Sequence, residues 1–162
     1  MMCLDDKFIL FVYGEGGHTA QMARLAPNLL NKLEGFNAIT LSDSSKKASW
    51  SFSHVVTGEF RNKHKWLGMF TNLGPLSIFI ESYRLIQKYN IRVIITTGPG
   101  IAISTALAGR ILGAKIIHIE TWSRFTSSSL SGRIMYLLAS KFYVQNESLL
   151  QLYPKAIFSG RL

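Results

Sequence analysis

Short apolar runs alternate with glycine turns and amphipathic segments along the whole chain, and this alternation limits the fold more than any other feature. The first run, Lys7–Tyr13, is apolar from Phe8 onward, which is typical of a strand buried on both faces. A glycine turn follows Tyr13, and apolar residues then recur at helical spacing as far as Leu33. Strands that alternate with helices form parallel sheets, because each helix returns the chain to the edge from which it started.

The alternation continues through the rest of the chain. Further strands are predicted at 36–41, 52–56, 93–97, 115–119, 142–145 and 156–158. Helices are predicted at 18–33, 76–89, 101–112, 131–140 and 147–152. A length of 162 residues suits one domain. The sequence therefore predicts a single α/β domain over residues 1–162, a Rossmann-like parallel sheet with helices on both faces.

Three unusual loops follow three of the predicted strands. They begin at Gly14, Gly98 and Glu120. Parallel strands present their carboxyl ends at one edge of the sheet, and ligands of such folds bind outside that edge. We therefore expect the three loops to converge on one site.

The first loop combines glycines with a polar helix start. Gly14, Gly16 and Gly17 allow backbone N–H groups to approach a phosphate or diphosphate at a helix N-terminus, although a tight turn alone also favours glycine. The spacing fits neither a Walker loop nor the dinucleotide-binding fingerprint. His18 is a candidate general base or a solvated helix residue, and Thr19 follows it.

The second and third loops also have two interpretations each. Gly98, Pro99 and Gly100 form either a ligand-approaching loop or a structural turn before the next helix. Glu120, at a strand end, is a candidate base or a ligand for sugar hydroxyls, or else an ion-paired carboxylate. Arg124 can pair with a phosphate.

The charge balance indicates a polyanionic partner. Eighteen Lys and Arg against nine Asp and Glu give a net charge of +9. A basic cluster followed by apolar residues can dock on an anionic membrane surface, or else be a solvated loop before a core helix. The residues expected to contact the membrane are Arg61, Lys63, Lys65, Trp66, Leu67, Met69 and Phe70. The other basic residues are scattered and form no recognised nucleic-acid-binding motif, so no nucleic-acid partner is expected.

Several classes of protein are excluded by composition. A single cysteine, Cys3, excludes a disulfide scaffold and a cysteine-based metal site. No apolar run approaches the roughly 18–20 residues of a membrane-spanning helix, and the first apolar run is too short for a signal peptide. We expect a protein that stays in the cytoplasm and uses neither a metal nor a cofactor.

Three segments occur in an order that resembles a known family: Gly14–His18, Thr97–Gly100 and Ile117–Thr121. Together they are similar to the acceptor-binding, N-terminal half of GT-B glycosyltransferases of the MurG kind. The resemblance extends in particular to stand-alone PssD-type polysaccharide biosynthesis proteins. Their eukaryotic relative is the membrane-anchoring subunit of the UDP-GlcNAc transferase that adds the second sugar in asparagine-linked glycosylation. Residues 142–145, 153–156 and 160–162 resemble the family's C-terminal segment.

The resemblance implies a two-component, UDP-sugar-dependent glycosyltransferase of cell-surface polysaccharide biosynthesis. This chain would bind a polyprenyl-pyrophosphate-linked saccharide as acceptor, and a small catalytic partner would bind the UDP-sugar donor. The eukaryotic members carry an N-terminal membrane helix that this sequence does not show. Attachment would therefore be peripheral, at the cytoplasmic face of the membrane.

The resemblance also implies roles for individual residues. His18 would be the first candidate for the general base, and Glu120 the second. Glu120 falls on the acidic position of a His-Glu-Gln-Asn segment, in which Thr121 and Trp122 replace the last two residues here. Contacts to the acceptor or its diphosphate are expected from Gly14, Gly16, Gly17, Thr19, Gly98, Pro99, Gly100, Thr121 and Arg124.

Two other functions stay open from the sequence alone. In the first, the chain only recruits and stabilises a partner at the membrane, and the partner performs all the chemistry. In the second, which the scattered basic residues and the missing binding motif disfavour, the chain is a basic nucleic-acid-binding module.

Overall fold

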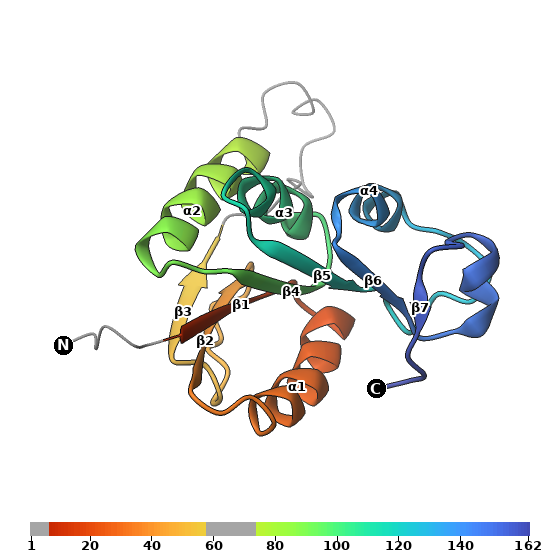
Figure 1. Ribbon diagram of the computed structural model, residues 1–162, viewed down its shortest axis with the longest axis horizontal. Helices are drawn as coiled ribbons and strands as arrows, with labels where there is room; N and C mark the ends of the chain where they lie inside the picture. Colours follow the sequence, from red (N-terminus) through yellow and green to blue (C-terminus); the bar gives the residue numbers. More distant parts are fainter. Residues whose placement is uncertain (1–6, 58–73) are drawn as a thin grey trace.

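The computed structural model describes residues 7–57 and 74–162, which form one sheet covered by helices on both faces (Figure 1). All pairings between neighbouring strands are parallel, and the strand order is β3-β2-β1-β4-β5-β6-β7. The strands are β1 (Lys7–Tyr13), β2 (Phe36–Ser42), β3 (Ser53–Val56), β4 (Val93–Gly98), β5 (Lys115–Ile119), β6 (Lys141–Val144) and β7 (Ile157–Phe158). The predicted Rossmann-like α/β fold is confirmed.

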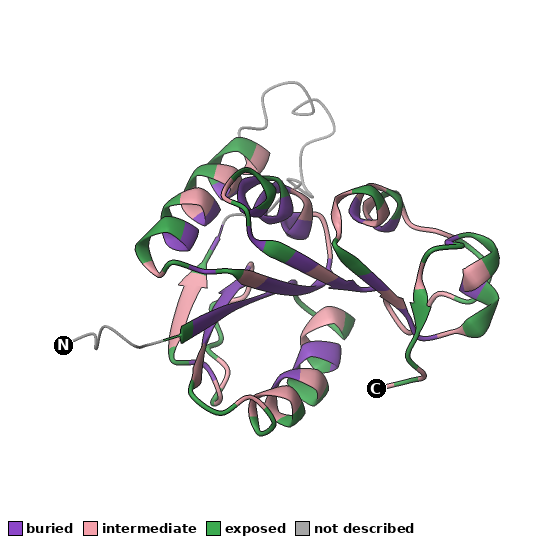
Figure 2. Ribbon diagram, viewed as in Figure 1, coloured by how far each residue is buried: buried purple, intermediate pink, exposed green. Residues whose placement is uncertain are grey.

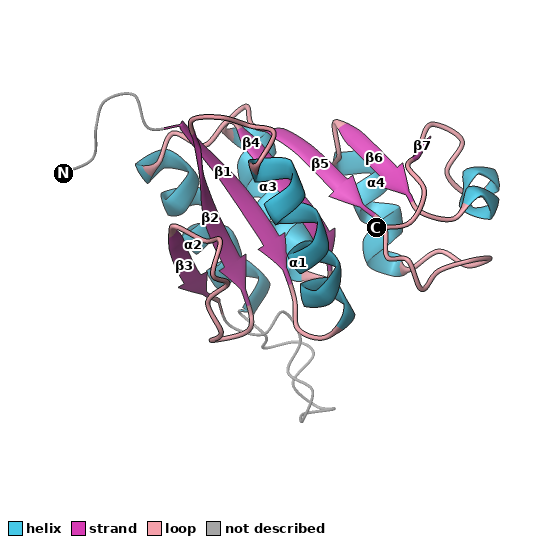
Figure 3. Ribbon diagram, turned by 90° about the horizontal axis from the view of Figure 1, so that it is seen from below, coloured by secondary structure: helices cyan, strands magenta, loops and turns pink. Residues whose placement is uncertain are grey.

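The helices divide unequally between the two faces of the sheet. One face is covered by α1 (Gly17–Leu30), seen in front of the sheet in Figure 3. The opposite face is covered by α2 (Gly74–Lys88), α3 (Ile101–Ile111) and α4 (Leu130–Leu138). A short 3₁₀ helix, η2 (Glu147–Gln151), precedes β7.

Two hydrophobic clusters, one on each face, explain the unbroken apolar runs of the central strands. Alternate side chains of a strand point to opposite faces, and in β1 both faces are covered. One set of β1 side chains packs under α2, α3 and α4, and it consists of Phe8, Leu10 and Val12. The other set packs under α1, and it consists of Ile9, Phe11 and Tyr13. Figure 2 shows the central strands largely buried, while the outer sides of the helices are exposed.

The predicted helices differ from the observed ones mainly at their ends. The helix expected from 76 begins at Gly74, because Pro75 fits the first turn of a helix, where its missing N–H needs no partner. The helix expected to reach 33 ends at Leu30. Beyond it, the N–H groups of Lys32 and Leu33 donate three residues back, to Leu29 and Leu30, which is 3₁₀ geometry.

The predicted membrane-contact cluster, residues 61–70, lies outside the described residues. Within residues 7–57 and 74–162, no helix has both the length and the hydropathy needed to cross a bilayer.

Candidate functional site

The first two loops meet where β1 and β4 end. The Gly14 N–H donates to the Gly98 carbonyl at 3.0 Å, so the two glycine loops are joined through their backbones. A Cβ atom on Gly14 would overlap Pro99 Cδ and lie 2.7 Å from Pro99 Cγ. The first loop therefore requires glycine at this position because of close packing against the second loop.

The start of α1 provides backbone donors beside this junction, for which no partner is found in residues 7–57 and 74–162. Gly16 is the N-cap residue with φ 74°, and its carbonyl accepts the N–H of Ala20 at 3.1 Å. The N–H groups of the first helical turn have no helical carbonyl to bind, which makes such a turn suitable for an anion. Thr19 stabilises the turn, because its hydroxyl donates to the Gly14 carbonyl at 2.7 Å.

His18 is held in one orientation by Thr97. The ring Nδ1 lies 2.6 Å from the Thr97 carbonyl, and the Thr97 hydroxyl donates to the His18 carbonyl at 3.1 Å. A carbonyl oxygen only accepts, so Nδ1 carries the proton and the lone pair of a neutral ring is on Nε2. The half-buried His18 thus has the tautomer that a general base needs.

Burial lowers the pKa of His18 below its usual range, while the Thr97 carbonyl and the Asp43 carboxylate oppose that decrease. His118 is fully buried, and burial followed by the neighbouring His18 lowers the pKa of His118 to about 3. Both imidazoles are therefore neutral at pH 7, and the Nε2 lone pair of His18 is available. His118 lies in the core, where the centroid of its ring is 5.1 Å from the centroid of the Phe142 ring.

Asp43 is a member of this region that sequence reasoning missed. Its Oδ1 accepts the Glu15 N–H at 2.9 Å, and a Cβ on Gly14 would lie 3.4 Å from Oδ2. Asp43 directly follows β2, at the same edge of the sheet as the glycine loops. Its position at a strand end is the pattern that could have indicated it.

The Glu120 carboxylate is enclosed. The residue is 4% exposed, its Oε1 accepts the Thr121 N–H at 3.0 Å, and its Oε2 accepts the Tyr153 hydroxyl at 3.3 Å. A Cβ on Gly132 of α4 would overlap Oε2. Burial raises the pKa of Glu120, and burial together with Glu120 raises the pKa of Tyr153 to about 12. The carboxylate therefore faces α4, and its role as a base stays a prediction.

The backbone of Glu120, in contrast, connects the third loop to α1, the helix that begins in the first loop. Its carbonyl accepts the side-chain amides of Gln21 at 3.3 Å and Gln145 at 3.0 Å. Both glutamines are buried, and Gln21 belongs to α1. The three loops lie at one edge of the sheet as expected, and the third is joined to the helix that begins in the first. No sequence pattern indicated the two glutamines.

Thr121 and Arg124 bond within their own loop. The Thr121 hydroxyl lies 3.1 Å from that of Ser123, and Arg124 Nη1 donates to the Ser127 hydroxyl at 3.2 Å. In the part of the chain that the structure describes, no three His, Cys, Asp or Glu side chains are grouped so that they can share a metal ion.

Known structures share this fold. MurG of Acinetobacter baumannii superposes with a TM-score of 0.68 at 13% identity, over 97% of this chain and 44% of MurG. A UDP-N-acetylglucosamine 2-epimerase superposes with a TM-score of 0.73 at 11% identity, over 96% of this chain and 48% of the epimerase. The chain thus spans less than half of each of these proteins. The predicted similarity to one half of MurG is confirmed at the level of the fold.

Relatives are also found by sequence. The UDP-N-acetylglucosamine transferase subunit ALG14 of Rattus norvegicus is 30% identical in an alignment 181 positions long, which covers 95% of this chain and 82% of the relative. The human subunit of the same name is 29% identical over 98% of this chain and 84% of its own length. The narrower resemblance to PssD-type proteins stays a prediction.

The family comparison covers nearly the whole chain. Residues 9–162 match the family described as "Oligosaccharide biosynthesis protein Alg14 like". That range includes all three loops of the candidate site. The chain belongs to the Alg14-like family of oligosaccharide biosynthesis proteins.

Proposed function

We propose that this chain is the acceptor-binding subunit of a two-component, UDP-sugar-dependent glycosyltransferase. Its family and its relatives named as transferase subunits support this role. The acceptor is a saccharide on polyprenyl pyrophosphate, used in cell-surface polysaccharide biosynthesis. A small partner protein holds the UDP-sugar donor.

The single observation that carries the proposal is the arrangement of His18. Its Nδ1 donates to the Thr97 carbonyl, and its half-buried ring stands in the first turn of α1, where the backbone N–H groups have no helical carbonyl to bind. A base and an anion-binding turn are therefore adjacent. These are the two features that a hydroxyl acceptor attached to a diphosphate requires.

The proposed reaction is an inverting transfer. The acceptor hydroxyl oxygen attacks the anomeric carbon of the donor sugar, and His18 Nε2 takes the hydroxyl proton. The bond from that carbon to the UDP oxygen breaks, and UDP leaves with the electron pair. The partner stabilises the charge on the departing UDP. The backbone N–H groups of the first turn of α1, beginning at Gly17, bind the acceptor diphosphate.

Membrane attachment is part of the proposal. The chain binds the cytoplasmic face peripherally, because its net charge of +9 favours anionic lipid and residues 61–70 join a basic cluster to an apolar one. Sedimentation with phosphatidylserine vesicles tests this. Replacing Lys63 and Lys65 by Gln should release the chain at physiological salt, whereas replacing Lys88 and Arg110 by Gln should not.

The function is tested by His18→Ala in the complex reconstituted with the partner. Turnover should fall by about 10²–10⁴-fold, the usual contribution of a general base, while the circular dichroism spectrum stays unchanged. Arg110→Ala, an exposed change on α3, serves as the control and should keep full turnover. Normal turnover of the His18 variant would instead favour a recruiting subunit whose partner performs all the chemistry.

A further inference from the structure

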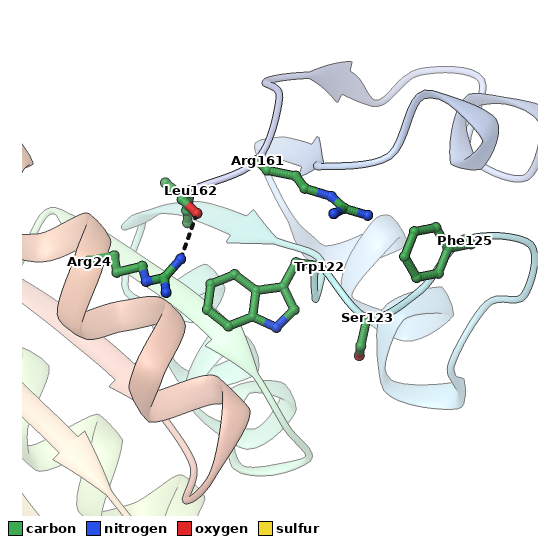
Figure 4. A pocket seen from close by; sticks show the side chains of 6 residues that line it. All are labelled: Arg24, Trp122, Ser123, Phe125, Arg161 and Leu162. Atoms are coloured by element: carbon green, nitrogen blue, oxygen red, sulfur yellow. Dashed lines mark hydrogen bonds between the residues drawn. The ribbon is translucent and has the colours of Figure 1, made fainter.

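A second concave site lies apart from the glycine loops, on the α1 side of the third loop (Figure 4). It has a volume of about 320 Å³. It is lined by Arg24 of α1, by Trp122, Ser123 and Phe125 after β5, and by Arg161 and Leu162 after β7. Three segments far apart in the sequence therefore build one pocket. None of the sequence motifs predicts a role for it.

The side chains that line the pocket carry two positive charges, those of Arg24 and Arg161, and in the 162-residue chain the main-chain carboxylate of Leu162 adds one negative charge. Arg24 Cζ lies 4.9 Å from the ring centroid of Trp122, and Arg161 Cζ lies 5.2 Å from that of Phe125. Arg24 Nη1 also donates to the main-chain oxygen of Leu162 at 3.1 Å. Two guanidinium groups against one carboxylate leave a net positive potential at the pocket, which a bound anion can neutralise.

Each guanidinium lies over an aromatic ring, and this cation–π contact holds it beside the pocket without using an N–H donor. Arg161 donates one hydrogen bond to the Asn146 side-chain oxygen at 3.4 Å, and Arg24 donates one to the main-chain oxygen of Leu162. In the described part of the chain, the other N–H groups of both side chains stay available. Because the side chains are already held, binding an oxyanion costs little additional rotamer entropy.

The size and lining of the pocket favour a small ligand with an apolar body. A volume of about 320 Å³ is at the lower end for small-molecule sites and suits one sugar ring with one charged group. The rings of Trp122 and Phe125 offer apolar surface, and the hydroxyl of Ser123 offers a hydrogen bond. We infer that this pocket binds an anionic saccharide, meaning a sugar that carries a phosphate or a carboxylate.

The pocket is a neighbour of the candidate catalytic region rather than part of it. Arg24 follows His18 by six residues of α1, a rise of about 9 Å along the helix axis. A group bound here therefore lies away from the His18 ring. The inference does not depend on the proposed transfer reaction, so its failure would leave that proposal unchanged.

Calorimetric titration of the purified chain tests the inference with four probes: glucose 1-phosphate, glucuronate, methyl glucoside and inorganic phosphate. Glucose 1-phosphate or glucuronate should bind, and comparison of the two distinguishes a phosphate ligand from a carboxylate ligand. Methyl glucoside and inorganic phosphate should each bind at least tenfold more weakly than the better anionic sugar. Equal binding of methyl glucoside, or equal binding of inorganic phosphate, would overturn the inference.

Matched variants locate the binding. The double variant Arg24→Gln, Arg161→Gln should bind the better anionic sugar at least tenfold more weakly than the native chain. The control double variant Lys88→Gln, Arg110→Gln should keep the native affinity. Both double variants lower the net charge from +9 to +7. Thermal unfolding checks that both double variants stay folded. Unchanged affinity in the first variant would overturn the inference. So would a wild-type chain that binds no sugar but loses its protein partner when the two arginines are replaced, because the pocket would then be a protein interface.

Discussion

His18 and Glu120 lie at the same edge of one sheet, yet the two side chains have opposite surroundings. His18 is half-buried, and among the described residues only its ring atom Nδ1 has a hydrogen-bond partner. Glu120 is 4% exposed, and both of its carboxylate oxygens accept hydrogen bonds. Between their loops runs β4, whose end supplies the Thr97 carbonyl to His18.

The difference shows that position at a strand end does not by itself make a reactive group. The direction of the side chain relative to the sheet decides whether a titratable group faces a bound ligand or is buried in the core. Thr97 points toward α1 and holds His18, whereas the Glu120 side chain points toward α4. His18 therefore has the geometry of a base, and Glu120 has the geometry of a buried support for its loop.

The largest effect expected is on transfer when each candidate base is replaced by its closest amide. His18→Gln should reduce turnover by about 10²–10⁴-fold, because glutamine cannot accept the proton. Glu120→Gln should stay within about tenfold of the native rate, because the amide keeps the volume and one acceptor oxygen. Steady-state assays of the reconstituted complex decide the matter. Equal losses in the two variants would break the distinction, and a loss in Glu120→Gln alone would reverse it.

A second experiment moves the His18 ring without changing the residue. In Gly98→Ala, the new Cβ would lie 3.1 Å from His18 Cε1, at a φ of +92°. Gly113→Ala is the matched control, because Gly113 has a φ of +76° and no neighbouring atom lies within 4 Å of an added Cβ. Both variants should lose about 1–2 kcal/mol of unfolding free energy through backbone strain. Only Gly98→Ala should lose at least tenfold in transfer, and equal activity of the two variants would contradict the proposed arrangement.

The enclosure of Glu120 can be tested through stability. In Gly132→Ala, the added Cβ would overlap Glu120 Oε2 and lie 2.8 Å from the Tyr153 hydroxyl. Overpacking of this kind costs about 1–3 kcal/mol of unfolding free energy. Gly17→Ala in α1 meets nothing within 4 Å and should change stability by less than about 1 kcal/mol. Urea denaturation measures both variants, and similar midpoints would mean that the Glu120 pocket is open.

The neutral His118 predicts a dependence of stability on pH. Its folded-state pKa of about 3 is below the usual 6.5, so between these values the unfolded chain binds a proton that the folded chain does not. Unfolding free energy should therefore decrease as pH falls below 6.5, by about 1.4 kcal/mol per pH unit from this group. His118→Phe should flatten the slope between pH 6.5 and 5. An unchanged slope would mean that His118 titrates normally in the folded protein.

The smallest effect expected concerns Asp43. The Asp43 carboxylate raises the pKa of His18, so Asp43→Asn should lower that pKa and move the acid limb of the rate profile to lower pH. Asparagine keeps an oxygen to accept the Glu15 N–H, so the loop should keep its shape. The pH dependence of kcat/KM measures the shift, and a shift to higher pH would exclude the electrostatic role of Asp43.

The sequence alone determined the order of strands and helices and the three loops of the site. Apolar runs, helical spacing and glycine turns are local patterns, and each is decided by residues close together in the chain. The predicted strand at 93–97 and the observed β4 (Val93–Gly98), for example, differ by one residue. The resemblance to MurG also rested on short motifs, each of which lies in one loop.

Tertiary structure alone decided which groups within those loops face one another. Gly14 reaches Gly98 only because β1 and β4 are neighbours in the sheet, although β2 and β3 separate them in the sequence. The same packing places the Asp43 carboxylate beside the Glu15 N–H and the Gln21 amide beside the Glu120 carbonyl. It also places the Glu120 side chain against α4. Crossover connections and side-chain direction set these contacts, and neither is encoded in the spacing of residues along a single loop.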